Sequence, residues 1–106
     1  VLKVQVSELE WNYELKGLGI RAQQPDRQQI QRYTQRGVVV SGINRRSELA
    51  KRGLRKGDLI YQIGDVNIST LEDLKLVANL LRRNYPFSIH FERGGQIGVI
   101  RNLIVQ

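Results

Sequence analysis

The stretch Lys16-Gly17-Leu18-Gly19-Ile20-Arg21-Ala22 decides how the rest of this chain is interpreted. Its two glycines flank a leucine, and glycine permits positive φ angles and a close approach of backbone amides because it has no Cβ atom. Amides that converge in this way form an anion-binding nest, and Lys16 adds a positive charge beside it. If Ile20–Ala22 continues as an open sheet edge, the stretch predicts a receptor for an extended peptide that ends in a free carboxylate. The alternative is a β-bulge whose glycines only bend a strand.

The composition is that of one small domain. The chain has 106 residues, of which 41% are hydrophobic, and this is enough for one modest core. It contains no cysteine, so disulfide and thiolate chemistry are excluded, and no segment approaches the length of a membrane span.

The formal net charge of +7 is carried by scattered pairs such as Arg45-Arg46 and Arg82-Arg83. A basic surface suits an acidic peptide, an anionic lipid or a nucleic acid. Because no aromatic residues interleave with the pairs to stack on bases, we interpret them as a solvated surface and expect no nucleic-acid partner.

Hydrophobic patterning predicts a mainly β fold with helices, of the α+β class. We expect strands over residues 1–6, 20–22, 38–40, 59–63, 66–68, 87–91 and 97–105, and helices over 26–35, 47–52 and 70–83. Ser7–Glu14 is interpreted as a connection in which Trp11 covers the edge of the core. The run Val38-Val39-Val40 is typical of a strand that is buried on both faces. Local signals predict Asp26 in the first turn of its helix, Ser47 as an N-cap, Gly53 as a helix end, and turns at Gly57-Asp58 and Gly64-Asp65. This order predicts a small antiparallel β-barrel or sandwich capped by one long and one or two short helices.

The long helix carries more apolar surface than a narrow core face requires. Ser69 and Glu72 have the spacing of a capping box, which begins the helix. One line of residues on the helix faces the core and comprises Leu71, Leu74, Ala78 and Leu81. A second line lies beside it and comprises Asp73, Val77 and Leu80. The second line predicts that the helix also walls a groove, and the alternative is one wide core-facing stripe.

The sequence lacks the constellations that catalysis or metal binding needs. His90 is the only histidine, and no serine lies in a nucleophile elbow that could accompany it. One histidine without cysteine makes no metal cluster. Gly17-x-Gly19 lacks the third glycine of a dinucleotide fingerprint. We therefore expect no enzymatic activity, no cofactor and no metal within these residues.

Four segments form a familiar series along the chain. They are Gly17-Leu18-Gly19-Ile20, Gly37-Val38-Val39-Val40, Ala50-x-x-Gly53-Leu54-Arg55-Lys56-Gly57-Asp58-Leu59-Ile60, and the capped helix that begins at Ser69. With them the chain resembles a PDZ domain, specifically the type found in the HtrA/Deg family of bacterial serine proteases. The resemblance covers nearly the whole chain from about Lys16. Two turns depart from the family pattern, Asn44-Arg45-Arg46 and Gly64-Asp65, and neither touches the proposed groove.

The resemblance implies a site for a peptide terminus. The amides of Leu18, Gly19 and Ile20 would hold the terminal carboxylate. The pocket for the last side chain would be shaped by Leu18, Ile20, Val77 and Leu80, and Asp73 would tune preference further along the peptide. The predicted peptide-binding residues are thus Lys16, Gly17, Leu18, Gly19, Ile20, Arg21, Ala22, Asp73, Val77 and Leu80.

The resemblance also implies a setting. Residues 1–10 would be the end strand or linker of a preceding module, and residues 11–106 would be the second, C-terminal PDZ module, in the permuted HtrA-type arrangement. The parent would be a periplasmic or cell-envelope protease, and the partners would be C-terminal or unfolded segments, the protease domain and sister PDZ modules. The alternatives are a structural module for oligomer assembly, or the PDZ of a secretion-system or intramembrane-protease component.

Overall fold

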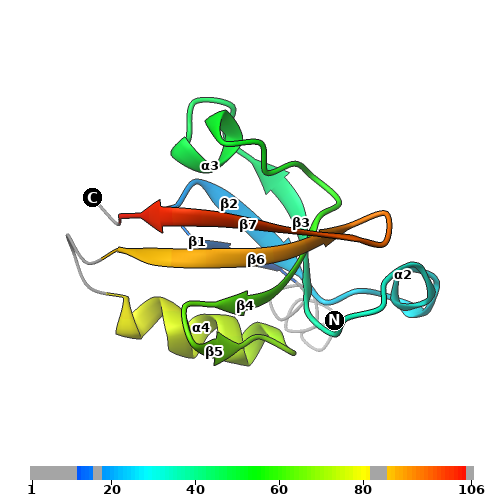
Figure 1. The fold of residues 1–106 in the computed structure, drawn as a ribbon. Coiled ribbons are helices and arrows are strands. Elements are labelled where there is room, and N and C mark those ends of the chain that lie inside the picture. The colour runs from blue at the N-terminus through cyan, green and yellow to red at the C-terminus, as the bar shows by residue number, and fades with distance from the viewer. Residues whose placement is uncertain (1–11, 16–17, 82–85, 105–106) are drawn as a thin grey trace, which may run out of the picture.

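The computed structural model describes residues 12–15, 18–81 and 86–104 (Figure 1). The strands form one antiparallel sheet in the order β1-β2-β3-β4-β6-β7, with β5 paired to β4. The strands are β1 Asn12–Leu15, β2 Ile20–Gln23, β3 Val38–Ile43, β4 Leu59–Ile63, β5 Val66–Asn67, β6 Phe87–Arg93 and β7 Gln96–Leu103; the helices are α2 Arg27–Arg32, α3 Glu48–Lys51 and α4 Leu71–Leu80. The predicted small antiparallel fold with one longer and two short helices is confirmed.

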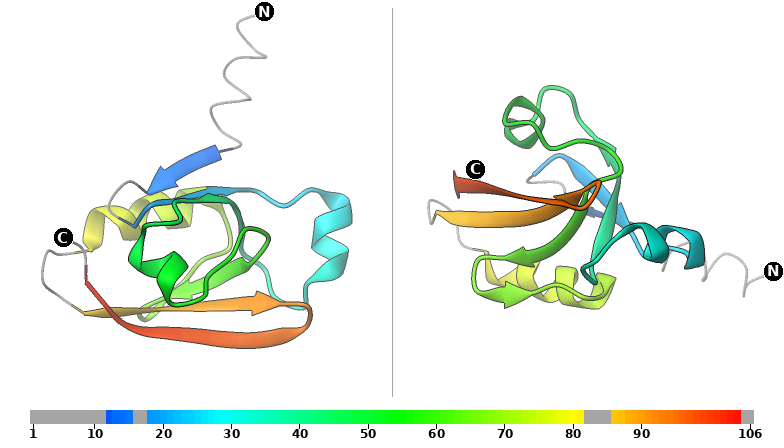
Figure 2. Two further views of the ribbon diagram at one scale, coloured as in Figure 1. Left: turned by 90° about the horizontal axis from the view of Figure 1, so that it is seen from above. Right: turned by 45° about the vertical axis from the view of Figure 1, so that its right-hand side comes forward.

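The sheet curls around a core that α4 closes on one side. In Figure 2 (left), β1 and α4 lie on one side of the molecule and the β6–β7 hairpin lies on the other. β3 crosses the middle, where Val38, Val39 and Val40 are 0%, 3% and 0% exposed, so the prediction of a strand buried on both faces is confirmed. Helix α4 contributes Leu71, Leu74 and Val77 to the buried residues.

The first described strand lies where the sequence analysis places a connection. Residues 12–15, of which 12–14 fall inside the predicted connection, form β1 and pair with β2 along its whole length. The mixed polar and apolar sequence Asn-Tyr-Glu-Leu has weak strand propensity, and its strand conformation comes from pairing with β2. The strand predicted over residues 1–6, and Trp11, lie outside the described residues.

Two predicted helix starts are displaced by one residue. Helix α4 begins at the N-cap Thr70, whose hydroxyl accepts from the amide of Asp73 at 3.2 Å, while the Asp73 carboxylate accepts from the amide of Thr70 at 3.2 Å. The capping box is therefore Thr70–Asp73 and not Ser69–Glu72. In the same way Asp26 is the N-cap of α2 and accepts from the amide of Gln29 at 2.8 Å, where a place in the first turn was expected.

The other local predictions are confirmed. Ser47 caps α3 by accepting from the amide of Ala50, and Gly53 follows the helix with φ +103°. Gly64 has φ +57° in the turn that joins β4 to β5, where Ile63 pairs with Val66.

Candidate peptide-binding site

Both edges of β2 are occupied. On one side Ile20–Gln23 pair antiparallel with β3, and on the other side the same four residues pair with β1, from Leu15 opposite Ile20 to Asn12 opposite Gln23. The expectation of an edge open at Ile20–Ala22 is therefore wrong for this conformation. The strand β1, which precedes β2 in the same chain, occupies the edge where a peptide ligand was expected.

β1 also makes the contact with the long helix. Helix α4 packs against β1, so the strand lies along β2 on the side where the helix runs, as the upper part of Figure 2 (left) shows. The direction of β1 is antiparallel to β2, which is the direction in which an added peptide strand pairs with the edge of an antiparallel sheet. β1 therefore occupies the place and the direction predicted for a peptide.

The loop before β2 needs a glycine at position 19. Gly19 has φ +70°, and a Cβ atom there would lie 2.8 Å from the Cβ of Ser47. Its carbonyl accepts from the amide of Asn44 at 2.8 Å, which ties the loop to the end of β3. The expectation that the Asn44-Arg45-Arg46 turn does not touch the proposed site is therefore wrong at Asn44. Within the described part of the chain no partner is found for the amides of Leu18 and Gly19. The register between β2 and β3 shifts at Arg21/Ala22 and not at Gly19, so this shift is not the glycine bulge considered as the alternative.

The structure brings together part of the predicted pocket. Leu18, Ile20 and Val77 belong to one buried cluster and are 8%, 1% and 3% exposed. Leu80 is 70% exposed and does not join them, and the carboxylate of Asp73 is used by the α4 capping box. Of the remaining predicted residues, Ala22 is buried, Arg21 is exposed, and Lys16 and Gly17 lie outside the described residues.

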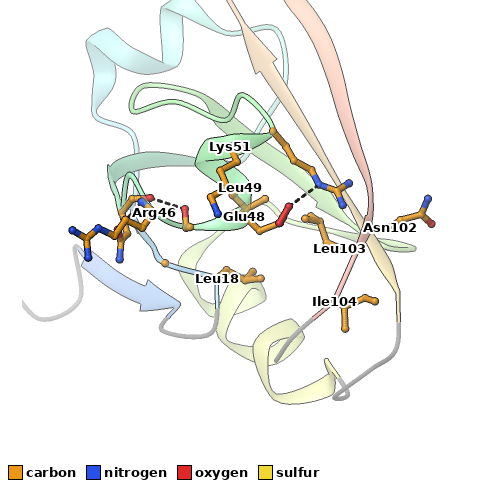
Figure 3. Close-up of a pocket in the computed structure, with 12 residues that line it drawn as sticks. Leu18, Arg46, Glu48, Leu49, Lys51, Asn102, Leu103 and Ile104 are labelled. Carbon is orange, nitrogen blue, oxygen red and sulfur yellow. Dashed lines mark hydrogen bonds and ion pairs between the residues drawn. The ribbon is translucent and has the colours of Figure 1, made fainter.

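A pocket of about 470 Å³ lies on the side of the loop that faces α3 (Figure 3). Leu18, Leu49 and Leu103 provide apolar side chains, and Arg46 and Lys51 are among the charged residues that line it. None of the residues that line it comes from α4. The pocket is thus not the predicted groove between β2 and α4, although Leu18 and Gly19 belong to both.

The structure explains the Gly57-Asp58 motif, for which the sequence suggested only a turn. The Asp58 carboxylate is buried and accepts from the amide of Arg55 at 2.8 Å and from the Nε and Nη2 atoms of Arg93 at 2.7 and 2.6 Å. Arg93 Nη2 also donates to the carbonyl of Gly53 at 2.7 Å, and the hydrogen bond to Asp58 raises the pKa of Arg93. The ion pair joins the α3–β4 connection to the end of β6.

A second buried carboxylate, Glu92, was missed by the sequence analysis. It is fully buried and accepts from the amide of Thr34 at 3.0 Å, from the Thr34 hydroxyl at 2.9 Å and from the amide of Gln35 at 3.0 Å. Nearby, the hydroxyl of Tyr33 donates to the carbonyl of Gly57. Burial raises the pKa of Tyr33, and the negative charges of Asp58 and Glu92 raise it further against the lowering effect of Arg32. These contacts fix the segment between α2 and β3.

In the part of the chain that the structure describes, no group of three or more metal-ligating side chains is found. No described helix is long and apolar enough to cross a membrane.

Comparison with known families gives one match. The family model described as PDZ domain matches residues 7–85, which is most of the chain and includes β1 through α4. No curated protein matches the sequence.

Proposed function

This chain belongs to the PDZ domain family, and we propose that it binds the C-terminal ends of other proteins as a strand added to β2. Members of this family are non-catalytic interaction modules that generally bind peptides. One observation carries the proposal: a four-residue segment already pairs antiparallel with this edge. The edge is therefore competent for strand addition. The amides of Leu18 and Gly19 have no partner among the described residues. These two residues directly precede Ile20, which is opposite the last residue of β1.

The expected affinity is moderate. On an edge of β2 that is free, an added strand gains three or four backbone hydrogen bonds, each contributing about 0.5–1.5 kcal/mol net. Burying a terminal side chain the size of leucine adds about 1.5–3 kcal/mol, while association and ordering of the peptide cost several kcal/mol. The remainder corresponds to a dissociation constant on the order of micromolar.

In the finer form of the proposal, the module belongs to an HtrA-type serine protease of the bacterial periplasm or cell envelope. The support is the resemblance of the run from Ala50 to Ile60 to that family. Weak binding of this kind becomes useful when several modules of one oligomer engage exposed chain ends together, because each contact raises the effective concentration for the next. The module would then deliver substrates to the protease or regulate it.

Titration with peptides tests the binding proposal. Peptides with an apolar last residue are prepared with a free carboxylate or with a C-terminal amide, and binding is followed by fluorescence anisotropy. We expect the free acid to bind more tightly, and equal affinity for the two forms would eliminate carboxylate recognition. The gene upstream of Val1 tests the protease setting, because a trypsin-like domain with Gly-x-Ser-Gly would be encoded there.

A second candidate function is assembly of the parent oligomer, and β7 is the observation that favours it. β7 ends the sheet order, and its Ile97 and Val99 side chains are 51% and 39% exposed. An edge strand with exposed apolar side chains readily pairs with another chain. If β7 is an assembly edge, Ile97→Lys and Val99→Lys will reduce self-association in sedimentation equilibrium, whereas Gly19→Pro will leave it unchanged. Unchanged association in the lysine variants would exclude this edge.

A further inference from the structure

We infer that β1 is a built-in competitor for the peptide edge of β2, so that a peptide binds only by displacing residues 12–15. The inference rests on the proposed function and deepens it, because it also defines which peptides can bind. It begins from the register, in which all four residues of β2 are paired on both sides. No position of β2 is left for a further strand.

Of the two strands that hold β2, β1 is the one that can leave. β3 is held on its other side by β4, with Val38 opposite Ile60, and its valines are buried in the core. Among the described strands, β1 is at the end of the sheet order and pairs only with β2. Releasing it breaks one short ladder and its contact with α4, while the rest of the sheet stays paired.

The short connection to β2 makes β1 an effective competitor. Only residues 16–19 separate the two strands in the sequence. A tether this short gives the attached segment an effective concentration on the order of millimolar. β1 therefore outcompetes free segments that offer the same backbone pairing and nothing more.

A peptide ligand can present a free C-terminal carboxylate, whereas β1 cannot. The strand β1 ends at Leu15 opposite Ile20, and the chain continues into Lys16, so β1 presents no carboxylate at this point. The amides of Leu18 and Gly19 have no partner among the described residues. A free C-terminal carboxylate can use these donors, and hydrogen bonds to a charged acceptor are about twice as strong as neutral ones. β1 thus acts as a filter that admits chain ends and rejects internal extended segments.

A reversible cross-link tests this inference on the whole chain. Glu14 and Arg21 are directly opposite each other in the register, at a Cα separation that suits a disulfide. The chain has no cysteine of its own, so the double variant Glu14→Cys/Arg21→Cys forms a single defined bond. Oxidation holds β1 on the edge, and reduction frees it in the same molecule. A matched control, His90→Cys/Val99→Cys, places a disulfide across β6 and β7, away from β2.

The probe is the peptide Trp-Asn-Tyr-Glu-Leu with a free carboxylate, which repeats residues 11–15 of this chain and so matches the edge. We expect the oxidised Glu14→Cys/Arg21→Cys protein to bind it at least about tenfold more weakly than the reduced protein, and the control pair to bind equally in both states. A second variant, Tyr13→Pro/Glu14→Pro, weakens pairing of β1 because proline cannot donate to the ladder, and it should bind the peptide at least about tenfold more tightly than the unmodified chain.

The outcomes separate the two proposals. Equal binding by the oxidised and reduced proteins would overturn the competitor role and leave peptide binding standing. No binding by the reduced protein, the proline variant or the unmodified chain would overturn both. Equal affinity of the proline variant for the free acid and for the amidated peptide would overturn the filter for chain ends.

Discussion

Removing Asp58 and removing Arg93 from their ion pair should lower stability by different amounts, because the two side chains differ in burial. The Asp58 side chain is 2% exposed and the Arg93 side chain is 42% exposed. In Asp58→Asn the partly exposed guanidinium of Arg93 can be hydrated instead. The variant therefore loses two charge-assisted hydrogen bonds, and hydration of Arg93 compensates for part of their free energy. We expect the free energy of unfolding to fall by about 2 kcal/mol.

Arg93→Ala should be more harmful, because the amide of Arg55 is then the only donor to the buried carboxylate among the residues that the structure describes. Removing one partner of a buried ion pair costs about 3–5 kcal/mol. Urea unfolding measured at neutral pH by circular dichroism would report both variants as shifts of the midpoint without a change in slope.

Glu48→Gln provides the matched control. Its ion pair with Arg52 has a separation of 3.6 Å and side chains that are 61% and 38% exposed, so the change in unfolding free energy should stay within about 0.5 kcal/mol. If Asp58→Asn proved as harmful as Arg93→Ala or more so, the argument from burial would be refuted.

Three further predictions concern the stability of the domain. Glu92→Gln should lower the free energy of unfolding by about 1.5–3 kcal/mol in urea titrations, because one acceptor oxygen facing Thr34 is lost; a change below about 0.5 kcal/mol would show that water replaces it. The pKa of Tyr33 is raised above its ordinary value of 10.0, so the unfolded chain loses this proton first and stability falls as pH rises above about 10. Tyr33→Phe should lessen that fall in thermal melts between pH 9 and 11, and an unchanged fall would assign it to other groups. Leu80→Ser should change the free energy of unfolding by less than about 0.5 kcal/mol because Leu80 is 70% exposed, and a larger loss would place this side chain in the core.

The sequence was informative wherever structure depends on neighbours along the chain. The valines of β3, the cap at Ser47 and the turn at Gly64 each follow from a few adjacent residues, and all three predictions are confirmed. The capping box of α4 was misplaced by one residue because Ser69 and Thr70 are both good N-caps, and both have an acidic residue three positions later.

Features that join distant segments could not be predicted in this way. The partners of Glu92 are 57 and 58 residues away, and no periodicity identifies them. The same holds for β1, whose strand conformation depends on pairing with β2. The groove residues were named from a resemblance, which gives the positions of Leu18, Ile20 and Val77 but not the strand that covers the edge beside them.

The central claim is that the amides of Leu18 and Gly19 receive a chain terminus while β1 leaves β2. Two-dimensional NMR of the ¹⁵N-labelled protein, titrated with free-acid and amidated forms of one peptide, tests it most directly. We predict that the free acid shifts the Leu18 and Gly19 amide signals most strongly and speeds hydrogen exchange in residues 12–15, whereas the amidated form does neither. Shifts that are the same for both forms, or that leave Leu18 and Gly19 unchanged, would contradict the claim.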